Sequence, residues 1–104
     1  MTIFKIIPVA DFSPLAEFIP SQPADDGCAF IHLCDENTIE KCSKKFFPGV
    51  ELVVLEIDLE KVFRAGFDVK FEYNPGGSNQ YWHFYRTGEQ LIPMSAVIAT
   101  TLMS

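Results

Sequence analysis

The segment from Gly27 to Asp35 constrains the fold most, because it is a short strand-like run that is apolar on both faces. Successive side chains of a strand point to opposite sides, so one face carries Cys28, Phe30, His32 and Cys34, and the other carries Ala29, Ile31 and Leu33. A strand of this kind is expected inside a sheet rather than at its edge. The sequence therefore predicts a sheet built around this segment, with the ionisable side chain of His32 projecting from it.

Length and composition predict one folded domain, residues 1–104, because a shorter piece would be too small to bury a core. The chain is 48% hydrophobic and has ten phenylalanines, a composition that excludes disorder. No apolar run approaches the roughly 20 residues that cross a membrane, and residues 1–10 do not resemble a signal peptide. We therefore expect a cytoplasmic protein without a membrane partner. The net charge of −6 also argues against nucleic acid as a partner.

Three cysteines and two histidines are the side chains best suited to metal binding or nucleophilic chemistry. An odd number of cysteines without a C-x-x-C pair predicts free thiols packed as small hydrophobic side chains. Cys28, His32, Cys34 and His83 are metal-ligand types, but their spacing matches no zinc pattern, so no metal is predicted. Cys34 lies before a predicted helix start and shares a face with His32, which leaves a cysteine nucleophile as an open alternative.

The remaining pattern predicts an α+β domain in which a small curved sheet, mixed or antiparallel, carries two helices. The helices are expected over residues 9–19 and 35–46, the second capped by Asp35 or Asn37, with a further helical turn over 59–66. Further strands are expected over residues 2–8, 51–58, 67–73, 81–85 and 92–102, with a loop over 20–27 and a turn over 74–79. One strand–helix–strand unit, residues 27–58, allows some parallel pairing.

Two predicted strands carry charged side chains for which the sequence pattern predicts a direction. Lys5 lies on a mostly apolar face, and we expect its stem to follow the sheet with the ammonium group in water; a cation at a pocket rim is the alternative. In the strand over 67–73, alternation predicts that Glu72 faces solvent, while Phe67, Val69, Phe71 and Tyr73 face inward. In the next strand, Tyr81, His83 and Tyr85 share one face.

Five short blocks, in order along the chain, resemble a bacterial family known as domain of unknown function 952. They are residues 3–8 with Asp11 and Phe12, residues 29–32, residues 55–58, the pair Phe71-Glu72, and residues 83–85. The chain departs from that family at Lys5, which replaces a histidine, at Leu33-Cys34, which replaces Cys-Ser, and at Arg86-Thr87, which replaces Gly-Pro. A lysine can pair with a diphosphate as a point charge but lacks the geometry of an imidazole.

The family in turn resembles the ADP-ribosyltransferase fold, a split, curved sheet with a nucleotide cleft between its halves. The resemblance implies a nucleotide-type ligand such as NAD or ADP-ribose, although the residues themselves assign no cofactor. Carried over residue by residue, the resemblance gives His32, Glu72, His83 and Tyr85 as candidates. We expect catalytic roles for His32, His83 and Glu72, and ligand-binding roles for Lys5, Tyr81, Tyr85 and Arg86. Because the family has no established reaction, the resemblance predicts a cleft and leaves open whether the chain is an enzyme.

A second hypothesis comes from a different class of protein. A lone histidine in a strand is commonly a hydrogen-bonded structural residue, and exposed aromatic side chains can meet a protein partner. On this hypothesis the chain is a non-enzymatic interaction module with structural histidines. The sequence makes no prediction of the oligomeric state.

Overall fold

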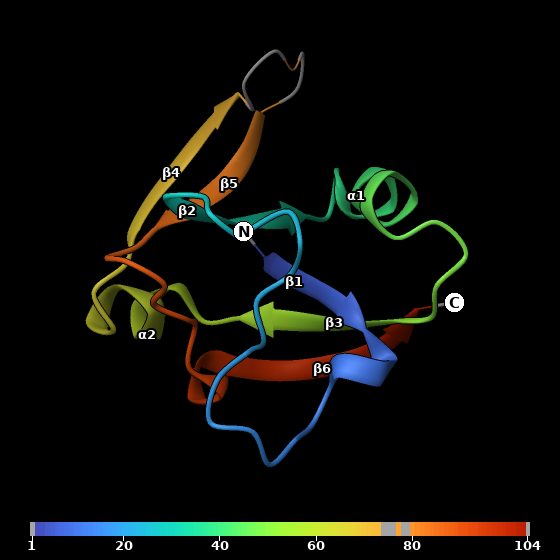
Figure 1. Ribbon diagram of the computed structural model, residues 1–104, viewed down its shortest axis with the longest axis horizontal. Coiled ribbons are helices and arrows are strands. Elements are labelled where there is room, and N and C mark those ends of the chain that lie inside the picture. The colour runs from blue at the N-terminus through green and yellow to red at the C-terminus, as the bar shows by residue number, and fades with distance from the viewer. Residues whose placement is uncertain (1, 74–76, 78–79, 104) are drawn as a thin grey trace.

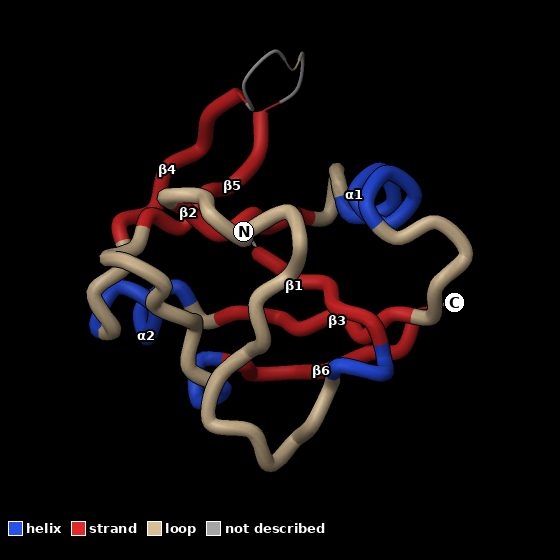
Figure 2. Tube along the Cα trace, in the orientation of Figure 1, coloured by secondary structure: helices blue, strands red, loops and turns tan. Residues whose placement is uncertain are grey.

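The computed structural model describes residues 2–73, 77 and 80–103, and within them six strands form one antiparallel sheet (Figure 1). The strands are β1 (Ile3–Pro8), β2 (Phe30–Asp35), β3 (Leu52–Ile57), β4 (Asp68–Tyr73), β5 (Gln80–Tyr85) and β6 (Val97–Met103). Their order across the sheet is β4-β5-β2-β1-β3-β6. The helices are α1 (Ile39–Phe46) and α2 (Leu59–Arg64), and 3₁₀ turns η1 (Val9–Asp11) and η2 (Met94–Ala96) complete the described elements (Figure 2). The α+β class, with a sheet and two helices, is confirmed.

The strand around His32 lies inside the sheet, as its two apolar faces predicted. β2 lies between β1 and β5. Parallel pairing, which the strand–helix–strand unit allowed, is absent from the described residues. The reason is that β1 lies between β2 and β3 and runs antiparallel to both, so the two strands joined through α1 do not touch.

The helix predicted over residues 9–19 is wrong. Only η1 is helical there, and the rest of the segment consists of a turn, a bend and an isolated bridge between Phe18 and Pro93. Pro14 lacks a backbone N–H and disfavours helical geometry in the residue before it. The segment instead bonds to residues far along the chain: the N–H of Ile19 donates to Ile92 O, and the N–H of Met94 donates to Glu17 O.

Helix α1 begins shortly after Asp35, the last residue of β2, and the Asp35 side chain organises the turn between them. The Asp35 carboxylate accepts hydrogen bonds from the N–H groups of Asn37 and Thr38, at 2.9 and 3.1 Å. Asp35 therefore organises the turn into α1, and the N-cap residue Thr38 makes no side-chain capping bond of its own. An aspartate also starts α2, where Asp58 accepts the N–H of Glu60.

Two apolar cores lie on opposite faces of the sheet. The larger contains Leu33, Leu55 and Phe84 and is closed by α2, η2 and Ile19. The smaller contains Ile6, Cys34, Val54 and Tyr81 and is closed by α1. Both faces of the central strands are thus covered, and the described part of the chain has no helix long and apolar enough to span a membrane.

Two sequence expectations need correction at the edges of this core. β4 is an edge strand, so Phe71 and Tyr73, expected to face inward, are exposed. Cys34 and Cys42 form a disulfide that ties β2 to α1, and Cys28 alone is free. The prediction of three free thiols is therefore wrong. The turn expected over 74–79 lies almost wholly outside the described residues.

The sheet is split along the line between β1 and β2. These strands pair only at Ile3 with Asp35 and at Phe4 with Cys34, whereas β1 pairs with β3 along its whole length. Beyond Phe4 the two strands separate, which leaves main-chain groups of β2 without partners from β1. The sheet thus consists of two three-stranded halves, β4-β5-β2 and β1-β3-β6, joined at a short seam.

Candidate functional site

The candidate site is built where β1 and β2 separate, because two charged side chains take the place of the missing main-chain bonds. Lys5 Nζ donates to the carbonyl oxygen of His32 at 3.0 Å, and the N–H of His32 donates to Asp25 Oδ1 at 2.9 Å. Lys5 and Asp25 also pair with each other, Nζ to Oδ2, at 2.6 Å. The main-chain N–H and C=O of His32 therefore bond to the ion pair instead of to β1. This meets the need of buried main-chain groups for hydrogen-bond partners.

The ammonium group of Lys5 was expected to reach water, and that prediction is wrong because the group is buried. The residue is 5% exposed, and its charge is compensated by Asp25, which is 1% exposed. Burial lowers the pKa of Lys5, although the neighbouring Asp25 carboxylate opposes that change. Burial alone would raise the pKa of Asp25, but the hydrogen bonds from His32 and the charge of Lys5 outweigh it and lower the pKa to about 2. The Asp25 carboxylate is therefore ionised at neutral pH.

The loop over residues 20–29 delivers Asp25, and Arg86 holds that loop in place. The guanidinium group donates to the carbonyl oxygens of Asp25 at 2.7 Å, of Cys28 at 3.2 and 3.3 Å, and of Gln90 at 3.2 Å. Most of its donors are thus occupied by main-chain oxygens. Arg86 was expected to bind ligand, and in the structure it positions the loop that carries the buried carboxylate.

Asp25 also fixes the imidazole ring of His32. Asp25 Oδ1 lies 2.9 Å from His32 Nδ1, so Nδ1 carries the proton in the neutral ring and Nε2 becomes the acceptor. Among the residues that the structure describes, none hydrogen-bonds to this Nε2, and the His32 side chain is 20% exposed. Its ring is surrounded by the rings of Phe30, His83 and Phe46, with centroids 4.9, 5.4 and 6.3 Å away.

The second histidine lies directly across the strand pair from the first, since His32 and His83 are register partners. His83 is 1% exposed and Phe30 stacks on it at a centroid distance of 3.9 Å. Its Nδ1 lies 2.9 Å from Glu72 Oε1, which also accepts the hydroxyl of Tyr85. Burial lowers the pKa of His83, opposed by Glu72, and the hydrogen bond to Glu72 raises the pKa of Tyr85.

Glu72, expected on a solvated face, has a side chain that is 36% exposed and that accepts hydrogen bonds from neighbouring side chains. Its carboxylate is half-buried on the same sheet face as Tyr81, because these two residues are register partners in β4 and β5. The hydrogen bonds from Tyr85 and His83 lower the pKa of Glu72. The structure therefore brings together His32, His83, Glu72 and Tyr85 on one face, with His83 covered by Phe30.

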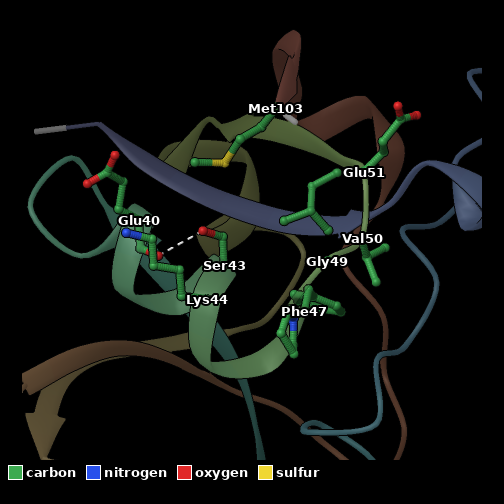
Figure 3. A pocket seen from close by; sticks show the side chains of 10 residues that line it. Glu40, Ser43, Lys44, Phe47, Gly49, Val50, Glu51 and Met103 are labelled. Atoms are coloured by element: carbon green, nitrogen blue, oxygen red, sulfur yellow. Dashed lines mark hydrogen bonds between the residues drawn. The ribbon is translucent and has the colours of Figure 1, made fainter.

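The cavity at the seam is small. Lys5, His32 and Tyr81 line a space of about 30 Å³ closed by α1, whereas ligand pockets typically measure roughly 300–1,000 Å³. A larger hollow of about 500 Å³ lies elsewhere, between the end of α1 and the start of β3, and contains none of the expected site residues (Figure 3). A ligand at His32 would therefore lie against the outer surface of the aromatic rings rather than inside the seam.

A metal site and a cysteine nucleophile were both considered for this site. No group of three or more histidine, cysteine or acidic side chains within the described ranges could hold a metal ion. Cys34, considered as a nucleophile, is bound to Cys42 and has no thiolate to offer.

Sequence reasoning missed Asp25, the residue that organises the site. A signal for it was present: a lysine on an apolar strand face needs a counter-charge when it is buried, and the loop before β2 carries Asp25 and Asp26. Phe30 was placed on the correct face but not assigned its role of covering His83.

A split antiparallel sheet with two helices, and a buried Lys–Asp–His arrangement at its seam, makes this chain a small α+β domain. The model described as "Protein of unknown function (DUF952)" matches residues 11–100, so the chain belongs to that family. Among solved structures, protein CC0527 from Caulobacter crescentus is similar, with a TM-score of 0.77 and 25% identity over 100% of this chain and 87% of that chain. A double methionine mutant of CC0527 gives the same values. None of the curated proteins matches.

Because the Asp25 carboxylate forms this ion pair, the free energy of unfolding should depend on pH in the acid range. The pKa of Asp25 is about 2 in the folded protein and 3.8 ordinarily, so its stabilising effect is complete above pH 3.8 and is lost as pH falls toward 2. The loss corresponds to about 2 kcal/mol. We expect the difference in free energy of unfolding between wild type and Asp25→Asn to shrink by this amount between pH 4 and pH 2. Urea denaturation at each pH measures it, with Asp26→Asn as the control for losing one exposed loop carboxylate; a difference independent of pH would contradict the assignment.

Proposed function

We propose that the chain binds a small nucleotide-type ligand, of the NAD or ADP-ribose kind, on the sheet face around His32. The observation that carries the proposal is the His32 ring, which Asp25 fixes with Nε2 directed away from the ion pair and unbonded within the described residues. An acceptor held in one tautomer can receive a hydrogen bond from a ribose hydroxyl or a base amine. When protonated, it can donate to a phosphate oxygen.

The surroundings of His32 support a planar, anionic ligand. Phe30 and Phe46 lie beside the imidazole and are both partly exposed, so they offer ring surfaces on which a base can stack. Two lysines flank this face: Lys45 lies 5.2 Å from the centroid of Phe46, and Lys70 lies 4.9 Å from the centroid of Tyr85. Their ammonium groups provide local positive charge for a diphosphate in a chain whose net charge is −6.

In this proposal the expected site residues take different roles. His32 contacts the ligand, Tyr85 borders it, and Glu72 with His83 holds the Tyr85 hydroxyl and the strand face in place. Lys5 and Arg86 position His32 through Asp25 and its loop rather than touching the ligand. Tyr81 is buried beside α1, in the seam cavity. The resemblance to ADP-ribosyltransferases supports the ligand class, and whether a reaction follows binding is left to experiment.

The test is a nuclear magnetic resonance shift titration of the labelled protein with ADP-ribose, NAD and AMP. We expect shifts concentrated at His32, Phe30, Phe46 and Tyr85. Two substitutions separate the two nitrogens of the ring: His32→Asn keeps a donor near the position of Nδ1 and removes Nε2, whereas His32→Gln keeps a polar group near the position of Nε2. We expect His32→Asn to keep the fold and weaken binding at least about tenfold, the equivalent of one lost hydrogen bond to a charged group.

Matched lysine variants test the electrostatic part of the proposal. Lys45→Gln and Lys70→Gln should each weaken the binding of ADP-ribose, while Lys41→Gln, on the same helix as Lys45 and also exposed, should not. A well-folded sample that gives no shifts with any of the three nucleotides would overturn the proposal. That result would favour the second hypothesis, an interaction module, for which the exposed aromatic rings of Phe71 and Tyr73 are the favouring observation.

A further inference from the structure

The disulfide between Cys34 and Cys42 joins β2 to a helix that has few other anchors on the sheet. Every residue of α1 is described by the structure, and among them Cys42 alone is fully buried. The other apolar side chains of the helix, Ile39 and Phe46, are only partly buried against the smaller core. The covalent bond is therefore the main attachment of α1 to the sheet.

The helix has little stability of its own. α1 has eight residues, whereas isolated helices shorter than about 12–15 residues are marginal in water. Its N-cap residue Thr38 makes no side-chain capping bond. We conclude that α1 keeps its form because it is held against the sheet.

The disulfide also lies beside the candidate site. Both cysteines line the seam cavity together with His32 and Phe46. Cys42 and Phe46 are four positions apart in one helix and so lie on the same face. The ring of Phe46 lies 6.3 Å from the ring of His32, measured between centroids. A movement of α1 would therefore carry Phe46 away from His32 and open the cavity on that side.

We propose that this disulfide is a redox switch, and that its reduction by a dithiol releases α1 from the seam and separates Phe46 from His32. A thiolate of the dithiol attacks one sulfur of the bond, forms a mixed disulfide and releases the other cysteine as a thiolate, which takes up a proton. The second thiolate of the reductant then displaces the remaining cysteine, which is also protonated, and the reductant closes its own disulfide. The reductant is thereby oxidised by the two electrons that convert the protein disulfide into two thiols.

Burial and spacing determine how such a switch would operate. Cys34 and Cys42 are 5% and 3% exposed, so the dithiol reaches the bond only when α1 opens transiently. The two cysteines are only eight positions apart, so their thiols stay close after reduction and the bond can form again. The switch should therefore be slow and reversible.

One consequence rests on the proposed function, because Phe46 and Lys45 border the face proposed for the nucleotide. Release of α1 withdraws a stacking surface and a positive charge from that face. We expect reduction to weaken the binding of ADP-ribose at least about fivefold, the effect of losing one ring on which a base stacks.

Nuclear magnetic resonance order parameters of the free protein test the switch without any ligand. After complete reduction with dithiothreitol, confirmed by thiol counting, we expect the backbone order parameters of Ile39–Phe46 to fall from about 0.85 to below about 0.6, while those of β3 stay near 0.85. The C34A/C42A variant should show the mobile helix with or without reductant. The C28A variant is the matched control, because it lacks only the free thiol, and should respond as the wild type does.

Two results would overturn the switch. One is unchanged order in α1 after complete reduction. The other is a loss of order in β3 together with α1, because the bond would then support the whole fold rather than one helix. Titration of ADP-ribose into both forms separates this proposal from the proposed function. Absence of binding to either form would overturn the proposed function alone, and equal binding to both forms would overturn the link between α1 and the ligand.

Discussion

Replacing Asp25 with asparagine is expected to lower the free energy of unfolding by about 3–5 kcal/mol, because it leaves the buried ammonium group of Lys5 without a counter-charge. Asp25 Oδ2 lies 2.6 Å from Lys5 Nζ, and both side chains are almost fully buried. The same substitution weakens the acceptor for the N–H and ring Nδ1 of His32. Urea denaturation at pH 7, followed by the fluorescence of Trp82, measures the loss.

Two further variants show whether the loss comes from the pair. Asp26→Asn changes the neighbouring carboxylate, which is exposed and bonds only to Ser21 Oγ among the described residues, and should cost less than about 1 kcal/mol. Lys5→Met combined with Asp25→Asn removes both charges and should recover a large part of the stability, so the double-mutant cycle gives a strong coupling energy. A cost below 1 kcal/mol for Asp25→Asn would mean that the pair does not stabilise the seam.

The second large effect is expected on reduction of the disulfide between Cys34 and Cys42. The cross-link joins residues eight positions apart and restricts the conformations of the unfolded chain. The loss of loop-closure entropy stabilises the folded protein by about 2–3 kcal/mol. Urea denaturation with and without reductant should show this difference in the free energy of unfolding. The C34A/C42A variant should be insensitive to reductant, and the C28A variant should respond as the wild type does.

Thiol counting provides an independent check on the same bond. The unfolded, unreduced protein should show the single free thiol of Cys28, and all three cysteines should react after reduction. Three reactive thiols before reduction would contradict the pairing. They would also restore the prediction, made from the odd cysteine count, that each thiol packs as a small hydrophobic side chain.

Local patterns in the sequence were enough to predict most of the sheet. Strands were predicted over residues 51–58 and 81–85, and the structure has β3 at Leu52–Ile57 and β5 at Gln80–Tyr85. Strand geometry alone also determines which side chains of one strand share a face. The segment over 9–19 was predicted wrongly because its apolar spacing suits a helix, while its actual structure depends on bonds to Ile92 and Met94, more than 70 positions away.

The candidate site was harder to predict, since it depends on contacts between distant segments. The face shared by His83 and Tyr85 follows from alternation along one strand and was predicted. That His32 lies on the same face depends on the register of β2 with β5, which alternation within a strand does not determine. The partner of Lys5 and His32 comes from a loop, where no periodicity constrains which side chain points inward. Glu72 was assigned to solvent by alternation, which cannot show that a face near the edge of a sheet still contains buried hydrogen-bond partners.

The seam between β1 and β2 has a consequence for how the chain can be divided. Each half of the sheet draws its strands from both ends of the sequence, β1, β3 and β6 in one and β2, β4 and β5 in the other. The connections from β1 to β2, β2 to β3, β3 to β4, and β5 to β6 all pass from one half to the other. The halves are thus interlaced along the polypeptide, so no single cut releases either of them intact. The backbone itself crosses the shortest junction in the sheet repeatedly, so neither half can be made from one uninterrupted segment of the chain.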